Sequence, residues 1–183
     1  MASSYVGLYD DCGSRSSFYR LQGNTRVGFK SFDNKARAKF AYNIQKELAN
    51  DNIAPRVYGE VGRIRSVGQL TDWGYLTELA KPLEYCDDEY CDGDCYDSDC
   101  PNSVLIQEVV CDLDECYGLP YVDGHRANFG YIRRNKQSIL VPIDFGIESF
   151  GDIDEERWGE VDWDNLIERD DCDCTACRGC YNG

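Results

Sequence analysis

The sequence has few of the residues that several common protein classes need. It contains one methionine and one histidine, His125, and it has no apolar run of the roughly 20 residues that a transmembrane helix requires. Hydrolysis by a Ser-His-Asp or Cys-His arrangement would therefore have to use His125. There is no internal repeat, and no cationic, apolar leader follows Met1. We therefore expect an intracellular, cytoplasmic protein, in which thiols stay reduced.

Positive charge is scarce over most of the chain. The net charge is −15, and residues 1–65 carry 11 Lys and Arg against 6 Asp and Glu, while the rest carries 8 against 28. No Lys or Arg stands between Lys81 and Arg126. Because nucleic acids and anionic membranes are bound mainly through basic side chains, we expect neither as a partner. An acidic surface of this kind suits a basic partner.

The pattern of apolar and turn residues predicts an α+β chain with two lobes. Strands are expected within residues 5–31, 56–65 and 73–79, a strand pair over 129–133 and 138–143, and helices over 34–50, 104–117 and 153–169. The apolar stripe of the first helix consists of Ala36, Phe40, Ile44 and Leu48. Lys81-Pro82 is expected to end the strand before it.

Two short motifs carry the residues of a phosphoryl-transfer site. Asp123 stands five residues before Asn128, and Asp144-Phe-Gly follows the next expected strand. Asp123 can accept a hydrogen bond from an attacking hydroxyl, while Asn128 and Asp144 can hold Mg²⁺ against ATP phosphates. His125 lies where a donor could touch the transferring phosphate, although a packed structural role is an equal alternative.

The N-terminal part offers residues that would bind the nucleotide. Lys30 ends an apolar strand and can place a positive charge on the phosphates, and Glu47 is expected on the inward face of the following helix, where it would steady Lys30. Upstream, Gly13, Ser14 and Ser16 belong to a small-residue turn whose backbone N–H groups could approach phosphates. An ordinary polar turn is the simpler alternative for that segment.

In this order, the Gly13 turn, Lys30, Glu47, the Asp123/Asn128 loop and Asp144-Phe-Gly resemble the protein-kinase-like superfamily. The Asp-x-His-x-x-Asn pattern is more similar to small-molecule and atypical kinases, and the Val-Gly-Phe-Lys strand resembles trimmed bacteriophage kinases. The resemblance implies ATP and Mg²⁺ as cofactors, and a host-cell cytoplasm if the source is viral. It also implies a hinge at residues 78–80, where the backbone of Glu78 and Ala80 would pair with adenine.

The resemblance further implies how the chain is divided. Residues 1–80 would form a kinase-like N-lobe of antiparallel sheet plus helix, and residues 81–183 a shortened, mainly helical C-lobe. At 183 residues the chain is short for a protein kinase. About 37 residues follow Asp144-Phe-Gly, and they contain no Ala-Pro-Glu motif, which places peptide-substrate recognition in doubt.

Eleven cysteines in a reduced compartment indicate metal ligands more than disulfides. The tail at residues 170–183 holds one set spaced for a tetrahedral zinc ion, with an iron–sulfur cluster or a disulfide-linked tail as alternatives: Cys172, Cys174, Cys177 and Cys180. The acidic loop at residues 84–102 holds a second, looser set: Cys86, Cys91, Cys95 and Cys100. Such metal staples would compensate for the small core of a short lobe.

The sequence therefore predicts an ATP- and Mg²⁺-dependent kinase that acts on a hydroxyl acceptor, either a protein Ser/Thr or a small molecule. Two alternatives stay open. The same fold could transfer a nucleotide instead of a phosphoryl group, or the chain could be a kinase-shaped protein that binds and inhibits a basic partner without catalysis.

Overall fold

The structure, a computed structural model, describes residues 9–12, 16–21, 23–64, 72–86, 91, 95 and 100–158. It is an α+β structure with two antiparallel sheets and two long helices. Within the described residues the chain forms two compact units, one of residues 9–42 and 57–78, the other of residues 43–56 and 79–158. Among these residues no helix combines the length and apolar character needed to cross a bilayer.

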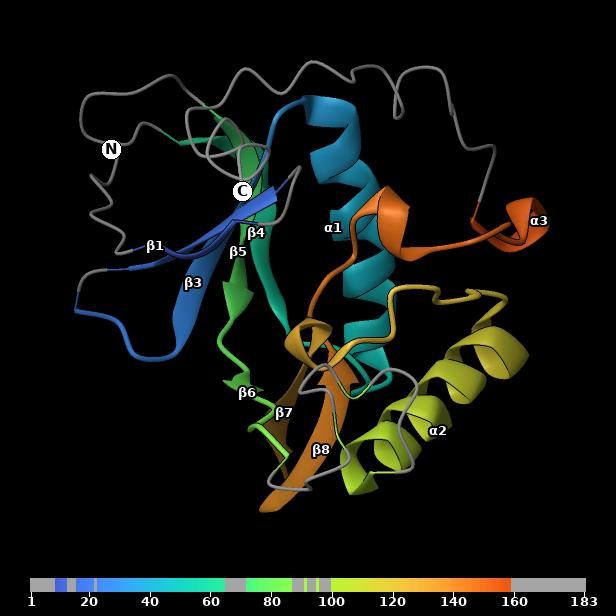
Figure 1. Cartoon of the computed structure of the whole chain (residues 1–183). Coiled ribbons are helices and arrows are strands. Elements are labelled where there is room, and N and C mark those ends of the chain that lie inside the picture. Colours follow the sequence, from blue (N-terminus) through green and yellow to red (C-terminus); the bar gives the residue numbers. More distant parts are fainter. Residues whose placement is uncertain are drawn as a thin grey trace, which may run out of the picture. The chain divides into compact units, whose positions relative to one another are not determined.

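The first unit contains a five-stranded antiparallel sheet with the strand order β1-β2-β3-β5-β4 (Figure 1). Its strands are β1 (Tyr9–Cys12), β2 (Ser16–Arg20), β3 (Val27–Phe32), β4 (Val57–Ile64) and β5 (Asp72–Glu78). Gly28 on β3 lies directly beneath the Phe18 ring, where a Cβ atom would collide with it. The strands predicted over 18–21, 26–30, 56–65 and 73–79 are present with small displacements at their ends, whereas β1 covers residues that were expected to form a turn, and residues 5–8 of the first predicted strand lie outside the described residues.

The helix α1 (Lys35–Asn50) follows β3 and begins beside Asn34, whose side-chain oxygen accepts a hydrogen bond from the Arg37 backbone at 2.9 Å. Of the predicted apolar stripe, Ile44 and Leu48 are buried, whereas Ala36 and Phe40 are only half-buried. In the first unit the buried helical side chains include instead Ala38, Ala41 and Tyr42.

Aromatic side chains form the core of the first unit. Tyr75 on β5 stacks on Phe32 with ring centroids 5.9 Å apart and meets the edge of Tyr42 at 5.5 Å. The Tyr42 hydroxyl donates to the Gly59 carbonyl at 2.7 Å. This contact ties the first half of α1 to β4, so the helix is fixed on the sheet by a hydrogen bond as well as by packing.

The second unit contains a three-stranded antiparallel sheet with the order β6-β7-β8. Its strands are β6 (Lys81–Pro82), β7 (Phe129–Arg134) and β8 (Gln137–Pro142). Asn135 and Lys136 join β7 to β8 with φ values of 50° and 69°, the left-handed pair that a tight hairpin turn requires. Lys81-Pro82 does not simply end a strand, as expected, but forms the short edge strand β6, a position that proline tolerates.

The helix α2 (Pro101–Tyr117) packs against β8 and against the short helix η1 (Arg126–Asn128) (Figure 1). It begins three residues before the predicted start, with Pro101 in its first turn, and ends at Gly118, whose φ of 61° is left-handed. The unit also holds η2 (Ile147–Ser149) and α3 (Glu155–Trp158).

The expectation of a mainly helical C-lobe is not supported by these residues. The described part of the second unit is organised around a sheet with one long helix beside it. Phe129 and Val141 on the hairpin, together with Phe145, are fully buried. The apolar side chains of the β7–β8 hairpin therefore form the core of this unit, where helices were expected.

Candidate functional site

The β7–β8 hairpin places Asn128 and Asp144 at the same end of the second sheet. Phe129 on β7 pairs with Pro142 on β8, and the Ile143 backbone N–H donates to the Asn128 carbonyl at 2.8 Å. Asn128 therefore stands opposite Ile143, one residue before Asp144. The backbone pairing thus brings two residues with oxygen-bearing side chains, 16 residues apart in sequence, to the same end of the hairpin.

A short hydrogen-bonded loop leads into this end of the hairpin. The buried Asn128 amide donates through Nδ2 to the Asp123 carbonyl at 3.0 Å and contacts His125 Nε2 at 3.0 Å. His125 Nε2 also lies 3.2 Å from Asp123 Oδ1. Because the amide nitrogen is occupied, the oxygen is the atom that Asn128 can offer to a metal.

Asp144 is held by its own turn and by a buried tyrosine. Its Oδ1 accepts a hydrogen bond from the Gly146 backbone at 3.1 Å, and its carbonyl accepts one from the Tyr121 hydroxyl at 3.0 Å. Burial, followed by the charges of Asp144 and Asp123, raises the pKa of Tyr121 well above its usual value. The charges of both carboxylates thus act on the same buried hydroxyl.

Two of the nucleotide-binding residues predicted for the N-terminal part, Lys30 and Ser16, lie on strands of the first sheet. Lys30 is buried near the middle of β3, opposite Phe18 and Tyr75, with its Nζ 5.8 Å from the centre of the Phe32 ring. Ser16 begins β2. Gly13 and Ser14 lie outside the residues that the structure describes.

Glu47 and the expected hinge can also be placed. Glu47 is exposed on α1, not on its inward face as expected. Glu78 ends β5 opposite Val27, and Ala80 is half-buried just before β6. One of the divisions between the first and second units falls between Glu78 and Leu79.

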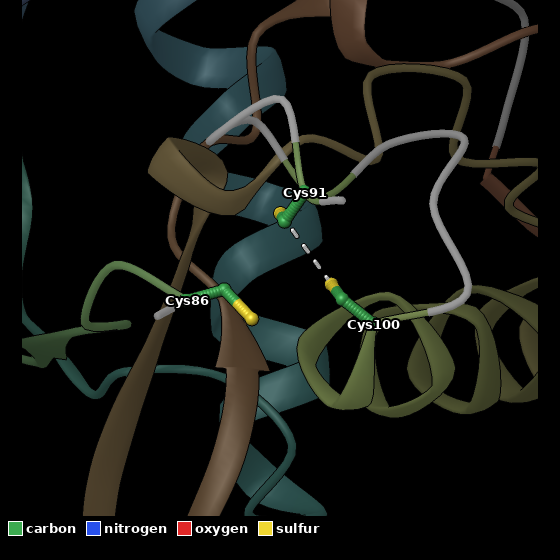
Figure 2. Close-up of side chains that lie close together, drawn as sticks. All are labelled: Cys86, Cys91 and Cys100. Carbon is green, nitrogen blue, oxygen red and sulfur yellow. Dashed lines mark hydrogen bonds between the residues drawn. The ribbon is translucent and has the colours of Figure 1, made fainter. Parts of the chain in front are cut away.

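The cysteines of the acidic loop converge on one point. The Sγ atoms of Cys86, Cys91 and Cys100 lie within 4.8 Å of one another, an arrangement that can hold a metal ion. Cys91 Sγ is 3.7 Å from Cys100 Sγ and 3.4 Å from Cys95 Sγ. Figure 2 shows Cys100 at the start of α2, facing Cys91, with the Cys86 sulfur directed toward the same space.

None of these sulfur–sulfur distances is that of a disulfide, and the distance of 3.7 Å between Cys91 and Cys100 is close to the edge of a tetrahedral site. A disulfide joins sulfurs at about 2.05 Å, whereas four sulfurs at about 2.3 Å from a tetrahedral zinc ion lie about 3.8 Å from one another. Cys95 is fully buried and its Sγ lies 3.4 Å from Cys91 Sγ, although it does not belong to the set of three that converge, so it is the candidate for a fourth ligand.

The cluster is built into the start of α2. Cys100 caps the helix, its Sγ accepting from the Ser103 backbone at 3.4 Å. Asn102, in the first turn, donates to Cys95 Sγ at 3.8 Å and to the Glu84 carbonyl at 3.1 Å. Burial, then hydrogen bonding to Cys91 and Cys100, raises the pKa of Cys95 to about 12. Metal binding here must therefore displace the Cys95 proton.

The remaining cysteines divide into two groups. Cys111 and Cys116 are exposed on α2. The predicted tail ligands lie outside the described residues: Cys172, Cys174, Cys177 and Cys180.

Sequence reasoning missed two supporting residues, Asn102 and Arg126. The signal for Asn102 was present, because Pro101 marks a helix start and places Asn102 in the first turn, next to Cys100. Arg126 carried a weaker signal, as the first basic residue after Lys81. It donates through Nη1 to the Leu83 carbonyl at 3.0 Å, a contact across 43 residues that no local pattern predicts.

Comparison with known proteins adds no family to this description. No protein-family model matches the chain, and no curated protein matches it.

Proposed function

We propose that the chain is an ATP- and Mg²⁺-dependent phosphotransferase that acts on a hydroxyl acceptor. The observation that carries the proposal is the shared position of Asn128 and Asp144 at one end of the β7–β8 hairpin, with Asp123 hydrogen-bonded to Asn128. Hard oxygen donors from one amide and one carboxylate, completed by phosphate oxygens, are the donor set that Mg²⁺ prefers.

Each residue has a role in this reaction. Asp123 orients the acceptor hydroxyl and takes its proton as the acceptor oxygen bonds to the γ-phosphorus and the bond to the β-phosphate oxygen breaks. Asn128 and Asp144 hold Mg²⁺, which neutralises charge on the phosphates. Lys30 contributes a further positive charge, and His125 steadies the loop through its contacts with Asp123 and Asn128.

A kinase-like, two-lobed organisation is part of the proposal. In its support, the first unit is a five-stranded antiparallel sheet with the first half of the helix α1 between its third and fourth strands, as the resemblance implies for an N-lobe. The Asp123, Asn128 and Asp144 motifs all belong to the second unit, where a C-lobe would carry them.

Zinc is the ion we propose for the cysteine cluster. Three converging thiols, with a fourth thiol, that of Cys95, next to Cys91, favour Zn²⁺ over the hard cation of the phosphate site. A closed set of four cysteine ligands is typical of a structural site, and reduced thiols suit an intracellular protein. The ion would brace the loop before α2 and take no part in phosphoryl transfer.

The proposal is tested by incubating zinc-loaded protein with Mg²⁺ and ATP labelled on the γ-phosphate, with candidate acceptors and with water as the minimal acceptor. We expect label in an acceptor or in released phosphate, and its loss in Asp144→Asn. Asp112→Asn makes the same change at an exposed position of α2 and should retain the activity. Equal transfer by wild type and Asp144→Asn would overturn the proposal.

Nucleotidyl transfer is the second candidate, because the same metal-holding residues can activate a different phosphate. ATP labelled on the α-phosphate distinguishes the two reactions. Label transferred from the α-position and not from the γ-position would replace the kinase assignment with a nucleotidyl transferase.

A further inference from the structure

The segment between β6 and the first cysteine of the cluster contacts the Asp123–Asn128 loop through one arginine. Arg126 donates through Nη1 to the Leu83 carbonyl at 3.0 Å, and its guanidinium lies 3.6 Å from the centre of the Tyr85 ring. Arg126 also begins η1, the turn that ends at Asn128. One side chain thus joins the residues preceding Cys86 to the turn that presents Asn128.

The same segment is fixed to the metal cluster from its other end. Cys86 directly follows Tyr85 and belongs to the sulfur cluster. Asn102 joins the Glu84 carbonyl to Cys95 Sγ. Residues 83–86 are therefore held by the cysteine cluster at one end and, at the other, by Arg126 and by the hydrogen bond from Leu83 N–H to the Phe129 carbonyl at 3.1 Å.

Tyr85 is an unusual partner for such a contact because its side chain is 74% exposed. Little packing holds the ring in place, so its position depends on the backbone of the segment. An exposed cation–π contact stabilises only weakly. Such a contact cannot order a loose segment by itself. When the segment is already fixed, however, the contact can hold the Arg126 side chain in a defined position.

We propose that metal binding at the cysteine cluster positions the Asp123–Asn128 loop, with Arg126 as the positioning residue that connects them. The metal fixes Cys86, and with it Tyr85, near Leu83, which its own hydrogen bond to the Phe129 carbonyl holds beside β7. Leu83 and Tyr85 hold Arg126, and Arg126 sets the start of the turn that carries Asn128. The effect on catalysis rests on the proposed function, whereas the structural connection does not.

The single histidine makes the connection directly measurable. His125 precedes Arg126 and touches both Asp123 and Asn128, so its imidazole NMR signals report on the loop without ambiguity of assignment. We expect removal of Zn²⁺ with a chelator to shift these signals in wild type and in Arg133→Ala, a matched loss of an exposed arginine on β7. In Arg126→Ala the signals should already be displaced in the zinc-loaded protein and should not respond to the chelator. No response in wild type, or the same response in Arg126→Ala, would overturn the proposal.

A second pair of variants covers the case in which metal removal or Arg126→Ala unfolds the protein. Tyr85→Ala removes the exposed ring, and Tyr85→Phe keeps it. We expect Tyr85→Ala to displace the His125 signals in the zinc-loaded protein and Tyr85→Phe to leave them at their wild-type positions. His125 signals that are identical in all three proteins would contradict the connection.

Nucleotide binding separates this inference from the proposed function. If both hold, Arg126→Ala and zinc removal should each weaken binding of Mg²⁺-ATP by about tenfold, as the loss of a supporting contact around a metal ligand commonly does, and the two effects should not add. If the His125 signals respond as expected but no form binds Mg²⁺-ATP, the connection stands and the phosphotransferase assignment fails.

Discussion

The Asn128 side chain is held in one orientation by the loop that precedes it. Its amide nitrogen is held by the Asp123 carbonyl, so the orientation of its oxygen is settled before any ligand arrives. Replacement by Asp would remove the N–H donor and place a carboxylate beside that carbonyl. The amide, rather than simply an oxygen ligand, is therefore what this position requires.

The assignment of Cys95 as the fourth zinc ligand leads to a prediction at the same scale. Cys95→Ser should lower the bound zinc by one ion per chain, because a neutral hydroxyl is a poor substitute for a thiolate. Metal content after gel filtration measures this directly. Cys111→Ser, at an exposed cysteine of α2, is the matched control and should keep its full zinc content.

Cobalt gives an independent check on the ligand set. The cobalt-substituted wild type should show the intense thiolate charge-transfer absorption of a tetrahedral sulfur site, reduced in Cys95→Ser. Unchanged zinc content and unchanged cobalt absorption in Cys95→Ser would exclude Cys95 as a ligand.

At the scale of elements, α2 depends on the residue that ends it. Gly118 has a φ of 61°, and a Cβ atom at this position would lie 2.8 Å from the Asp154 Cβ. Gly118→Ala should therefore lower the free energy of unfolding by about 1–3 kcal/mol, measured by urea denaturation. Gly23→Ala, with a φ of 77° but no atom within 4 Å, should cost less. Equal free energies of unfolding for Gly118→Ala and wild type would contradict the prediction, because they would show that the backbone at residue 118 accommodates a Cβ atom without strain.

Tyr121 leads to a pH-dependent prediction for the segment around Asp144. Its pKa is raised in the folded protein, so above about pH 10 the unfolded chain loses this proton first, and the free energy of unfolding falls as pH rises. Tyr121→Phe should cost about 1 kcal/mol at pH 7, through the lost hydrogen bond to the Asp144 carbonyl. Above pH 10 its stability should fall less steeply than that of wild type. Parallel curves for the two proteins would contradict this role.

Local signals predicted most of the elements. Turn residues at 134–136 marked the β7–β8 hairpin, and alternating apolar residues marked its strands. The start of α2 was missed because the acidic, cysteine-rich composition of residues 84–102 suggested a loop, although Pro101 signals a first helical turn. Strand β6 was missed because proline usually ends a strand, whereas this one lies at a sheet edge.

At the scale of the whole molecule, the chemistry was easier to predict than the packing. The Asp123, Asn128 and Asp144 motifs and the four loop cysteines could be named from residue types and spacing alone. The approach of Cys86, Cys91 and Cys100 to one another, and long-range contacts such as the one between Arg126 and Leu83, could not be predicted in this way. The exposed position of Glu47 was not predicted either, because helical periodicity alone did not settle which face of α1 would be buried.

Binding of Mg²⁺ with a non-hydrolysable ATP analogue tests the central claim most directly, because it does not require the acceptor to be known. Calorimetric titration of zinc-loaded protein should show binding by wild type and by Asp112→Asn, and an affinity lower by about tenfold or more in Asn128→Ala and Asp144→Asn. Equal affinity in all four proteins, or no binding by wild type, would contradict the assignment of Asn128 and Asp144 as the metal-holding pair of a phosphotransferase.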